Sequence, residues 1–285
     1  MVTLKSSNFY TDYALKSFFK YSKMDDNDEF LLIDNDDNKM DNFAVYKKID
    51  ILKNNNPLSF AENINQGIRV AKKSKKNLIF LNNDIIFTKN WFEPLKMNFK
   101  GISIPVSNQL FQYKSDCGNL TLKPTMKFKE DFKENYDLLN DIVKKHKKNF
   151  QPHQQFQRQL MPFFCFKIPC KILNEVGYFD ESFGTGGGED IDYRIRCAMK
   201  GYEVNFLLDS YVLHFHGKST WDGNETFDQT EARNKVYTEA FLKKWGNEMT
   251  QIFILRKDFY NILYEKGLND LFKQGKFGEL IRKLL

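Results

Sequence analysis

The chain has 285 residues, of which 41% are hydrophobic and 15% aromatic, and its formal net charge is +6. This apolar content is ample for one large core with an appendage, while no window is apolar enough to cross a bilayer, which excludes an integral membrane protein. Lysine clusters at residues 72–76 and 144–148 come with no nucleic-acid-binding motif, so we expect a solvated surface and no nucleic-acid partner.

The cysteines indicate a reducing compartment. They show no paired spacing, and Cys165 and Cys197 lie in apolar patterns that are typical of buried thiols. The start of the chain lacks the apolar run of a signal peptide. We therefore expect a cytoplasmic protein, at most peripheral to a membrane, and its lysine- and asparagine-rich composition suggests a bacterial or viral source.

Strand and helix patterns alternate through the first part of the chain. A helix capped by Thr11 or Asp12 should run to residue 20, and a second should lie within residues 56–70, where Ser59 and Glu62 form a capping box. This alternation predicts an α/β fold with a mostly parallel sheet and crossover helices. The expected strands of this part are residues 2–5, 29–33, 49–52 and 77–80.

Two of these strands end in polar clusters. The second runs into Asp34, and the fourth runs into Asn82, Asn83 and Asp84. A buried parallel strand delivers side chains to a ligand crevice in this way, because the carboxyl ends of such strands meet at one edge of the sheet. We therefore expect a ligand to bind there.

The second part of the chain is harder to interpret. Residues 107–159 contain a lysine-rich helical stretch at 126–149. His146 and His153 lie in the same region and are expected at the protein surface, not as ligands. We expect the residues from 246 onward to pack on the domain through apolar helix faces, with dimer formation or a membrane surface as alternatives. The remaining elements are expected as helices at 91–100, 171–176 and 231–245 and strands at 102–106 and 160–168.

The most informative stretch lies between residues 177 and 220. A glycine-rich run at 183–188 is followed by a helical pattern from Glu189 to residue 200, a strand at 203–208, and His214 and His216. Glu189 and Asp190 fall in the first helical turn, where the helix dipole favours negative charge. Carboxylates, a glycine loop and two histidines in one short stretch indicate a site.

This stretch resembles the acceptor-side region of inverting family-2 glycosyltransferases, which have the GT-A fold, and in particular their rhamnosyltransferase-like group. The family pattern has a G-x-F-D-E-x-F segment, a G-x-E-D-x-D-x-x-x-R segment, and a histidine before a glycine and Ser-Thr. The matching residues are Gly177, Phe179, Asp180, Glu181, Phe183, Gly188, Glu189, Asp190, Asp192, Arg196, Gly201, Tyr202, His214, Gly217, Ser219 and Thr220.

The resemblance extends to the first half of the chain. LLIDNDD resembles the strand that contacts the base and ribose, SFAENINQG resembles the helix motif after the third strand, and LNND resembles a loose D-x-D motif. The resemblance thus implies a site for a nucleoside-diphosphate sugar, with UDP the commonest nucleotide. The residues that it assigns to this site are Thr3, Asp34, Asn65, Asn82, Asn83, Asp84 and Lys218.

Glycosyl transfer needs a group that neutralises the departing diphosphate. A divalent cation bound by hard oxygen ligands or by carboxylate and imidazole serves this need, so we expect Mn²⁺ or Mg²⁺. By analogy with the family, Asp84 and His214 are the metal ligands, with His216 as second choice and Lys218 as a phosphate contact. The alternative for the histidines is a structural polar pair at a strand end.

Transfer also needs a base for the acceptor hydroxyl. The resemblance assigns this role to Asp190, with Gly187, Gly188 and Glu189 on the acceptor side. Asp192 lies four residues before Arg196 and points elsewhere on the helix, so we expect it to form a structural ion pair.

The sequence therefore predicts a metal-dependent inverting glycosyltransferase that acts on a glycan, lipid-linked or protein acceptor. We expect a GT-A domain at 1–245, with a donor half at 1–106 and an acceptor half at 107–245, and a helical extension at 246–285 that can mediate homo-oligomers or contact a membrane. A nucleotidyltransferase is less well supported, because residues 2–8 lack a glycine-rich loop. A catalytically weak or inactive protein that binds a glycan or nucleotide is the non-enzyme alternative, since Asn82 leaves one fewer carboxylate.

Overall fold

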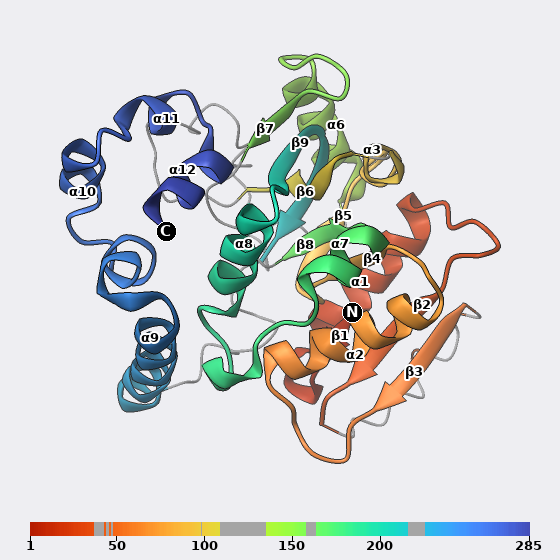
Figure 1. The fold of residues 1–285 in the computed structure, drawn as a ribbon. Helices are drawn as coiled ribbons and strands as arrows, with labels where there is room; N and C mark the ends of the chain where they lie inside the picture. Colours follow the sequence, from red (N-terminus) through yellow and green to blue (C-terminus); the bar gives the residue numbers. More distant parts are fainter. Residues whose placement is uncertain are drawn as a thin grey trace.

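The computed structural model describes residues 1–36, 43, 46, 48–97, 99–108, 135–157, 164–215 and 226–285. In these residues the chain forms two sheets covered by helices, and the C-terminal helices gather on one flank (Figure 1). The predicted α/β class is therefore confirmed. His216 and Lys218 fall outside the described residues, so their assigned roles stay predictions.

The first sheet is entirely parallel. Its register sets Thr3 opposite Asp34 and Asp34 opposite Lys53, so the carboxyl ends of its strands meet at one edge. The helix that follows the sheet starts with the predicted capping box, in which the Glu62 N–H donates to Ser59 Oγ (3.2 Å) and the Ser59 N–H donates to the Glu62 carboxylate (2.8 Å). These elements are β1 (Val2–Thr3), β2 (Phe30–Asp34), β3 (Ile49–Lys53) and helix α2 (Phe60–Lys73).

The first helix begins earlier than the sequence predicted. A 3-10 turn, η1 (Lys5–Ser7), leads directly into α1 (Asn8–Tyr21), so neither Thr11 nor Asp12 caps the helix. Thr11 is instead buried inside the helix, where its hydroxyl donates to the carbonyl of Ser7 (3.1 Å). Because this hydroxyl has a partner one turn back, Thr11 is compatible with the helix interior.

The second sheet is mixed and has the order β4-β8-β6-β9-β5, with β7 pairing on β9. β6 and β9 run parallel, whereas β8 is antiparallel to β4 and β6, and β5 is antiparallel to β9. β9 is longer than predicted and extends to His214, which pairs with Ile85. The strands are β4 (Leu78–Leu81), β5 (Ile85–Phe87), β6 (Gly101–Val106), β7 (Gln155–Gln157), β8 (Cys165–Ile168) and β9 (Glu203–His214).

The remaining helices cover the sheets and form the C-terminal flank. The helix expected at 91–100 is shorter, α3 (Glu93–Lys96), and α9 is interrupted by Gly246, whose φ of 80° and ψ of 176° are not helical. The others are α6 (Tyr136–Lys147), α7 (Cys170–Val176), η3 (Glu181–Phe183), α8 (Glu189–Met199), α9 (Phe227–Thr250), η4 (Gln251–Leu255), α10 (Phe259–Glu265), α11 (Asn269–Lys273) and α12 (Phe277–Leu284).

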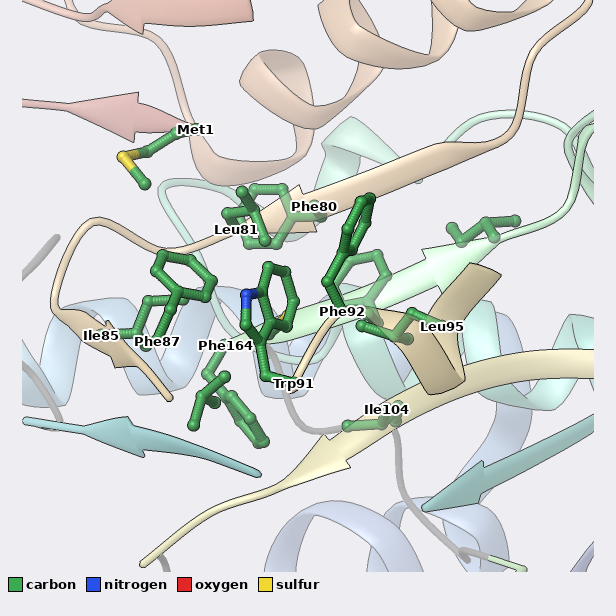
Figure 2. Close-up of a cluster of buried hydrophobic side chains, with 14 of the residues drawn as sticks. Met1, Phe80, Leu81, Ile85, Phe87, Trp91, Phe92, Leu95, Ile104 and Phe164 are labelled. Atoms are coloured by element: carbon green, nitrogen blue, oxygen red, sulfur yellow. The ribbon is translucent and has the colours of Figure 1, made fainter. Parts of the chain in front are cut away.

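Two hydrophobic clusters hold these elements together. The larger lies between the sheets and their helices and includes Trp91, which is fully buried with its ring 4.4 Å from that of Phe87 (Figure 2). The smaller joins one face of α8 to the C-terminal helices, through side chains such as Ile195 and Leu280. The predicted packing of the C-terminal residues on the domain is confirmed, and α8 is shared by both clusters.

The sequence also predicted whether four single side chains are buried or exposed. Cys165 and Cys197 are buried as predicted, and burial raises the pKa of both thiols. His153 is exposed as predicted, but the prediction for His146 is wrong, because only 8% of it is exposed. His146 lies on the inner face of α6 with Leu139 and Val143, since residues three or four apart share a helix face.

No helix in the described ranges is long and apolar enough to cross a membrane.

Candidate active site

The expected metal ligands lie together at the end of the second sheet. Asp84 follows β4 directly before β5, and the pairing of Ile85 with His214 brings it next to the end of β9. Asp84 Oδ1 is 3.1 Å from His214 Nε2, and both side chains are buried. The ring of Phe164 stacks on His214 with a centroid distance of 5.3 Å, which fixes the plane of the imidazole.

The two asparagines before Asp84 hold the turn in place. The Asn82 N–H donates to the carbonyl of Phe164 (2.7 Å), while Asn83 Nδ2 donates to Ser7 Oγ (2.7 Å) and Thr11 Oγ1 (2.8 Å). Thr3 belongs to the same network, because its hydroxyl is 2.6 Å from that of Thr11. The Oδ1 atom of Asn83 is buried and has no hydrogen-bond partner in the described part of the chain.

Asp34 lies at the neighbouring edge, at the end of β2, and is fully buried. The residue that follows it, Asn35, accepts hydrogen bonds from Asn54 Nδ2 (2.8 Å) and from the Leu58 N–H (2.9 Å). A narrow cavity of about 30 Å³ connects this edge with the turn before Asp84. Its lining residues are Val2, Leu4, Asn35, Leu58, Phe60, Asn63, Phe80, Asn82 and Asn83.

Asn65 contacts a different part of the molecule from the other residues assigned to the nucleotide. Its side chain is buried and donates to the carbonyl of Phe179 (2.9 Å) and to the Glu181 carboxylate (2.8 Å). It also accepts a hydrogen bond from the Phe179 N–H (2.8 Å). Three of the four hydrogen bonds that an asparagine amide can form are therefore made within the protein. A nucleotide contact for Asn65 stays a prediction.

The glycine loop (residues 184–188) lies between α8 and α9. Four of its residues are glycines with φ between 82° and 158°, a range that side-chain-bearing residues rarely adopt. At Gly187 an added Cβ would lie 2.6 Å from the ring of Tyr237 on α9, so a side chain has no room there. The Glu189 carboxylate accepts a hydrogen bond from the Gly187 N–H and closes the loop onto α8.

Glu189 and Asp190 form an adjacent pair of carboxyl groups at the start of α8. Only 3% of Glu189 is exposed, and Asp190 is half-buried with its Oδ1 accepting from the Ile191 N–H (2.7 Å). Burial raises the pKa of both carboxyl groups, and the charge of Asp190 raises that of Glu189 further. Backbone hydrogen bonds lower both pKa values, as does the charge of Arg233 for Glu189 and of Arg256 for Asp190. Burial has the larger effect, so both pKa values are raised.

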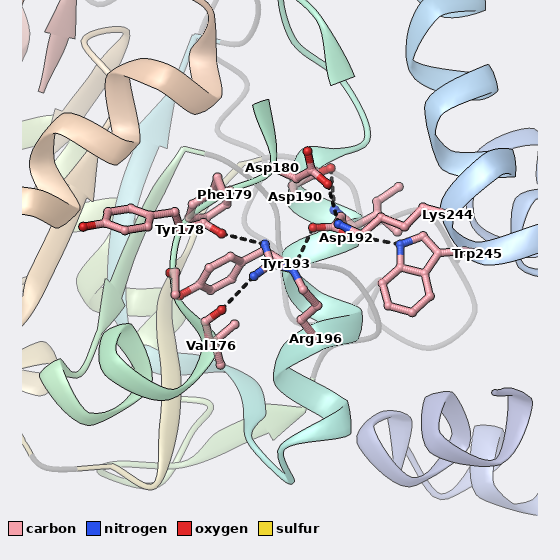
Figure 3. Close-up of polar contacts among 12 residues, drawn as sticks. Val176, Tyr178, Phe179, Asp180, Asp190, Asp192, Tyr193, Arg196, Lys244 and Trp245 are labelled. Carbon is pink, nitrogen blue, oxygen red and sulfur yellow. Dashed lines mark hydrogen bonds and ion pairs between the residues drawn. The ribbon is translucent and has the colours of Figure 1, made fainter. Parts of the chain in front are cut away.

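Asp192 forms the structural ion pair that the sequence predicted. Its fully buried carboxylate accepts from Arg196 Nε (2.8 Å), from Trp245 Nε1 (3.0 Å) and from Lys244 Nζ (2.7 Å) (Figure 3). Lys244 also pairs with Asp180, just before the glycine loop. Sequence reasoning missed Lys244 and Trp245, which belong to α9 and lie more than fifty residues farther along the chain. Their only signal was their place in a predicted helix.

The residues assigned from the sequence therefore form two groups. Thr3, Asp34 and the turn at residues 82–84 lie around the ends of the parallel strands, with His214 beside them. Glu189 and Asp190 lie at the glycine loop, under α9. Among the described residues, no group of three or more His, Cys, Asp or Glu side chains is arranged to hold a metal ion.

Several glycosyltransferase structures share the arrangement of these elements. The structure of GalNAc-T7 with UDP, GalNAc and Mn²⁺ superposes with a TM-score of 0.57 and 16% identity, covering 94% of this chain and 51% of that one. The mannosyltransferase PcManGT of Pyrobaculum calidifontis with GDP-Man and Mn²⁺ gives 0.53 and 11%, covering 99% and 85%. The chain has the GT-A glycosyltransferase fold. S. aureus TarS with UDP-GlcNAc is a further GT-A neighbour, with a TM-score of 0.50, 14% identity and coverage of 93% and 71%.

The sequence similarity is narrower than this likeness of GT-A folds. No protein-family model matches the chain. A segment is 28% identical over 156 residues to the probable N-acetylgalactosaminyltransferase 6 of Caenorhabditis elegans, which is 50% of this chain and 24% of that protein. The chain thus spans about a quarter of the length of this curated relative.

Proposed function

We propose that the chain transfers a sugar from a nucleoside-diphosphate sugar to an acceptor hydroxyl, with the help of a divalent metal. The observation that carries this proposal is the contact between Asp84 and His214, a carboxylate and an imidazole that lie 3.1 Å apart and 130 residues apart in sequence. Asp84 follows β4 and His214 ends β9, and the turn before Asp84 borders the same cavity as Asn35, which follows Asp34 of β2. The neighbouring GT-A structures, which contain nucleotide sugars or nucleotides and Mn²⁺, support the same assignment.

The donor atoms of this pair fit a divalent cation. Two neighbouring ligands of an octahedral ion with bonds of about 2.1 Å lie about 3 Å apart, close to the observed separation of Oδ1 and Nε2. Asp84 and His214 would supply two ligands, and diphosphate oxygens and water would complete the coordination. When bound, Mn²⁺ or Mg²⁺ neutralises the charge that develops on the departing diphosphate.

The protein's own residues prepare the donor side. Phe164 holds the imidazole of His214 in its plane, and the hydrogen bonds of Asn82 and Asn83 fix the turn that carries Asp84. Asp34 is proposed to contact the base or ribose, because it is buried at the carboxyl end of a parallel strand, where open α/β sheets bind ligands. These side chains are therefore ordered before the ligand arrives.

On the acceptor side, Asp190 is proposed to accept the proton of the attacking hydroxyl. Its raised pKa favours this role, since a general base works best with a pKa close to the operating pH. Glu189 is tied to Gly187 and is proposed to shape the acceptor subsite. Proton removal by Asp190 and direct attack on the anomeric carbon would give inversion, as the family-2 resemblance implies.

Nucleotide binding tests this proposal most directly. We expect UDP or GDP to raise the midpoint of thermal unfolding in the presence of Mn²⁺, and we expect EDTA to reverse the shift. A ligand at 100 times its Kd stabilises a protein by about 2.7 kcal/mol, which is easily measured. Asp84→Ala and His214→Ala should both lose the Mn²⁺ dependence, and full nucleotide affinity in EDTA would contradict a metal held by this pair.

A transferase and an inactive nucleotide-binding protein would both pass this binding test, so turnover must be measured separately. The binding alternative is favoured by Asn82, which stands where a second carboxylate would help to hold the metal. Slow hydrolysis of UDP-sugars or GDP-sugars that requires Mn²⁺ would identify an enzyme. Proton NMR of the transferred sugar's anomeric signal would then establish inversion or retention.

A further inference from the structure

The first turns of α2 are bonded to the nucleotide edge. Asn63 Oδ1 accepts from Asn54 Nδ2 (2.9 Å), and the same Asn54 amide donates to Asn35, which directly follows Asp34. The Leu58 N–H, just before the helix, donates to Asn35 as well. A chain of short hydrogen bonds therefore links the end of β2 to the start of α2.

The opposite side of α2 is bonded to the segment that enters the glycine loop. Asn65 makes three hydrogen bonds to Phe179 and Glu181, and the Phe60 N–H donates to the carbonyl of Thr185 inside the loop (3.2 Å). Asn63 and Asn65 are two positions apart, so they point to opposite sides of the helix. The helix thus lies between the two halves of the site and contacts both (Figure 1).

The glycine loop depends on such outside contacts for its position. Its four glycines carry no side chains that could anchor it, and without a Cβ their backbone can adopt many other conformations. Phe179, whose backbone Asn65 holds, stacks on Tyr193 of α8 with ring centroids 4.0 Å apart (Figure 3). Asn65 therefore holds the backbone that leads into the loop and, through the ring of Phe179, contacts the packing of α8.

We propose that α2 couples the two halves of the site, and that Asn65 is the positioning residue through which nucleotide binding at the Asp34 edge orders the glycine loop. The proposal rests on the function proposed above. It gives Asn65 a role that differs from direct nucleotide contact, and it predicts that the loop responds to a nucleotide that does not touch it.

Four variants isolate this connection. Asn65→Asp keeps the size of the side chain but removes both donated hydrogen bonds and places a carboxylate against Glu181. Glu181→Ala removes one of the same bonds at an exposed residue, so the protein should fold, and Glu181→Gln keeps an acceptor for Asn65 and is the matched control. In the double variant Asn65→Asp with Glu181→Gln, the side-chain amide at position 181 can donate to the carboxylate at position 65 and restore one hydrogen bond.

The readout is hydrogen exchange of the full chain, alone and with UDP or GDP plus Mn²⁺, together with calorimetric nucleotide affinity. In the wild type and in Glu181→Gln, the nucleotide should slow exchange both at residues 33–36 and in the glycine loop. In Asn65→Asp and Glu181→Ala, Kd should stay within about threefold and the edge should remain protected, while loop protection falls at least several-fold. The double variant should recover part of it.

Two results would overturn the inference. The first is loop exchange that responds to the nucleotide equally in Asn65→Asp and in the wild type, or in neither. The second is a Kd that rises tenfold in Asn65→Asp but not in Glu181→Ala, which would make Asn65 a nucleotide contact. Failure of the wild type to bind either nucleotide with Mn²⁺ would instead overturn the proposed function.

Discussion

The two halves of the proposed site are built in different ways. The donor half is formed by strand ends, at which Asp34, Asp84 and His214 are placed by the register of neighbouring strands. The acceptor half is a glycine loop held by side chains of α2 and α9, which are far from it in sequence. The donor half therefore depends on sheet geometry, whereas the acceptor half depends on a few long-range contacts, and substitutions should affect the two halves differently.

The largest effect should follow removal of the proposed base. Asp190→Asn keeps the shape of the side chain but removes its basicity, so kcat should fall by about 10²–10⁴-fold, the usual contribution of a general base. Nucleotide Kd should stay within a few-fold, because Asp190 lies in the acceptor half. Steady-state kinetics with a saturating acceptor would measure this. Near-normal turnover would shift the role of base to Glu189.

A large loss of stability should follow removal of the Asp192 carboxylate. Asp192→Ala leaves Lys244 without one partner and opens a buried ion-pair network, which typically costs about 3–5 kcal/mol in unfolding free energy. Asp180→Ala is the comparison, because Asp180 also pairs with Lys244 but is partly exposed, and its removal should cost less than the removal of Asp192. Urea unfolding would measure both. Equal losses would show that burial does not govern this network.

A donor-half substitution should give the opposite kinetic pattern. Asp34→Ala removes a buried carboxylate proposed to contact the nucleotide, and a hydrogen bond to a charged group contributes about 1.5–3 kcal/mol, or roughly ten- to a hundredfold in Kd. Asp36→Ala is the comparison, since its half-buried carboxylate accepts from the Lys5 N–H. Calorimetric titration with UDP and Mn²⁺ would test the pair, and an unchanged Kd in Asp34→Ala would reject the contact.

A smaller effect should separate loop contact from backbone strain. Gly187→Ala and Gly201→Ala both place a side chain at positive φ, but only Gly187 would meet Tyr237, since nothing lies within 4 Å of a Cβ at Gly201. We expect about 1–2 kcal/mol of strain at Gly201, a larger strain at Gly187, whose φ of 125° lies farther from the left-handed helical region, and a further loss at Gly187 from the contact with Tyr237. Thermal unfolding would compare them. Tyr237→Ala combined with Gly187→Ala should recover only the additional loss, and equal melting temperatures of the two single variants would argue against close packing of α9 on the loop.

A last effect is a change in the pH dependence of stability. Because burial raises the folded-state pKa of Glu189 and Asp190 above their unfolded values, the folded chain holds extra protons, so their contribution to stability is complete below about pH 4 and is lost as the pH rises toward 8. Glu189→Gln should therefore flatten the decline in unfolding free energy above pH 5, relative to the exposed control Glu203→Gln. Parallel pH profiles for the two variants would contradict the raised pKa.

The sequence was most informative where structure is local. The capping box of Ser59 and Glu62 and the ion pair of Asp192 with Arg196 involve residues three or four apart, and both are present as predicted. The strands that deliver Asp34 and Asp84 could be located because apolar runs ended in polar clusters. The α/β class followed from the alternation of these strands with helices along the chain, and the GT-A fold was implied by the family resemblance.

Long-range contacts could not be predicted in the same way. Asn65 reaches a segment 114 residues away, and Trp245 reaches Asp192 across 53 residues, so no spacing along the chain indicates either contact. The burial of His146 depends on what covers α6, and the raised pKa of Glu189 depends on what covers the glycine loop. Each of these properties is set by tertiary packing.

The sharing of α8 by two hydrophobic clusters has a consequence for where the chain can be cut. A boundary after residue 245 looks natural in the sequence, because Gly246 breaks α9 there. Truncation after residue 245, however, would expose the buried side chains of Ile195 and Ala198 on α8, the helix that carries Asp190. The last forty residues are therefore part of the packing that holds the acceptor half of the proposed site. A truncated protein should lose cooperative unfolding before it loses the proposed nucleotide binding.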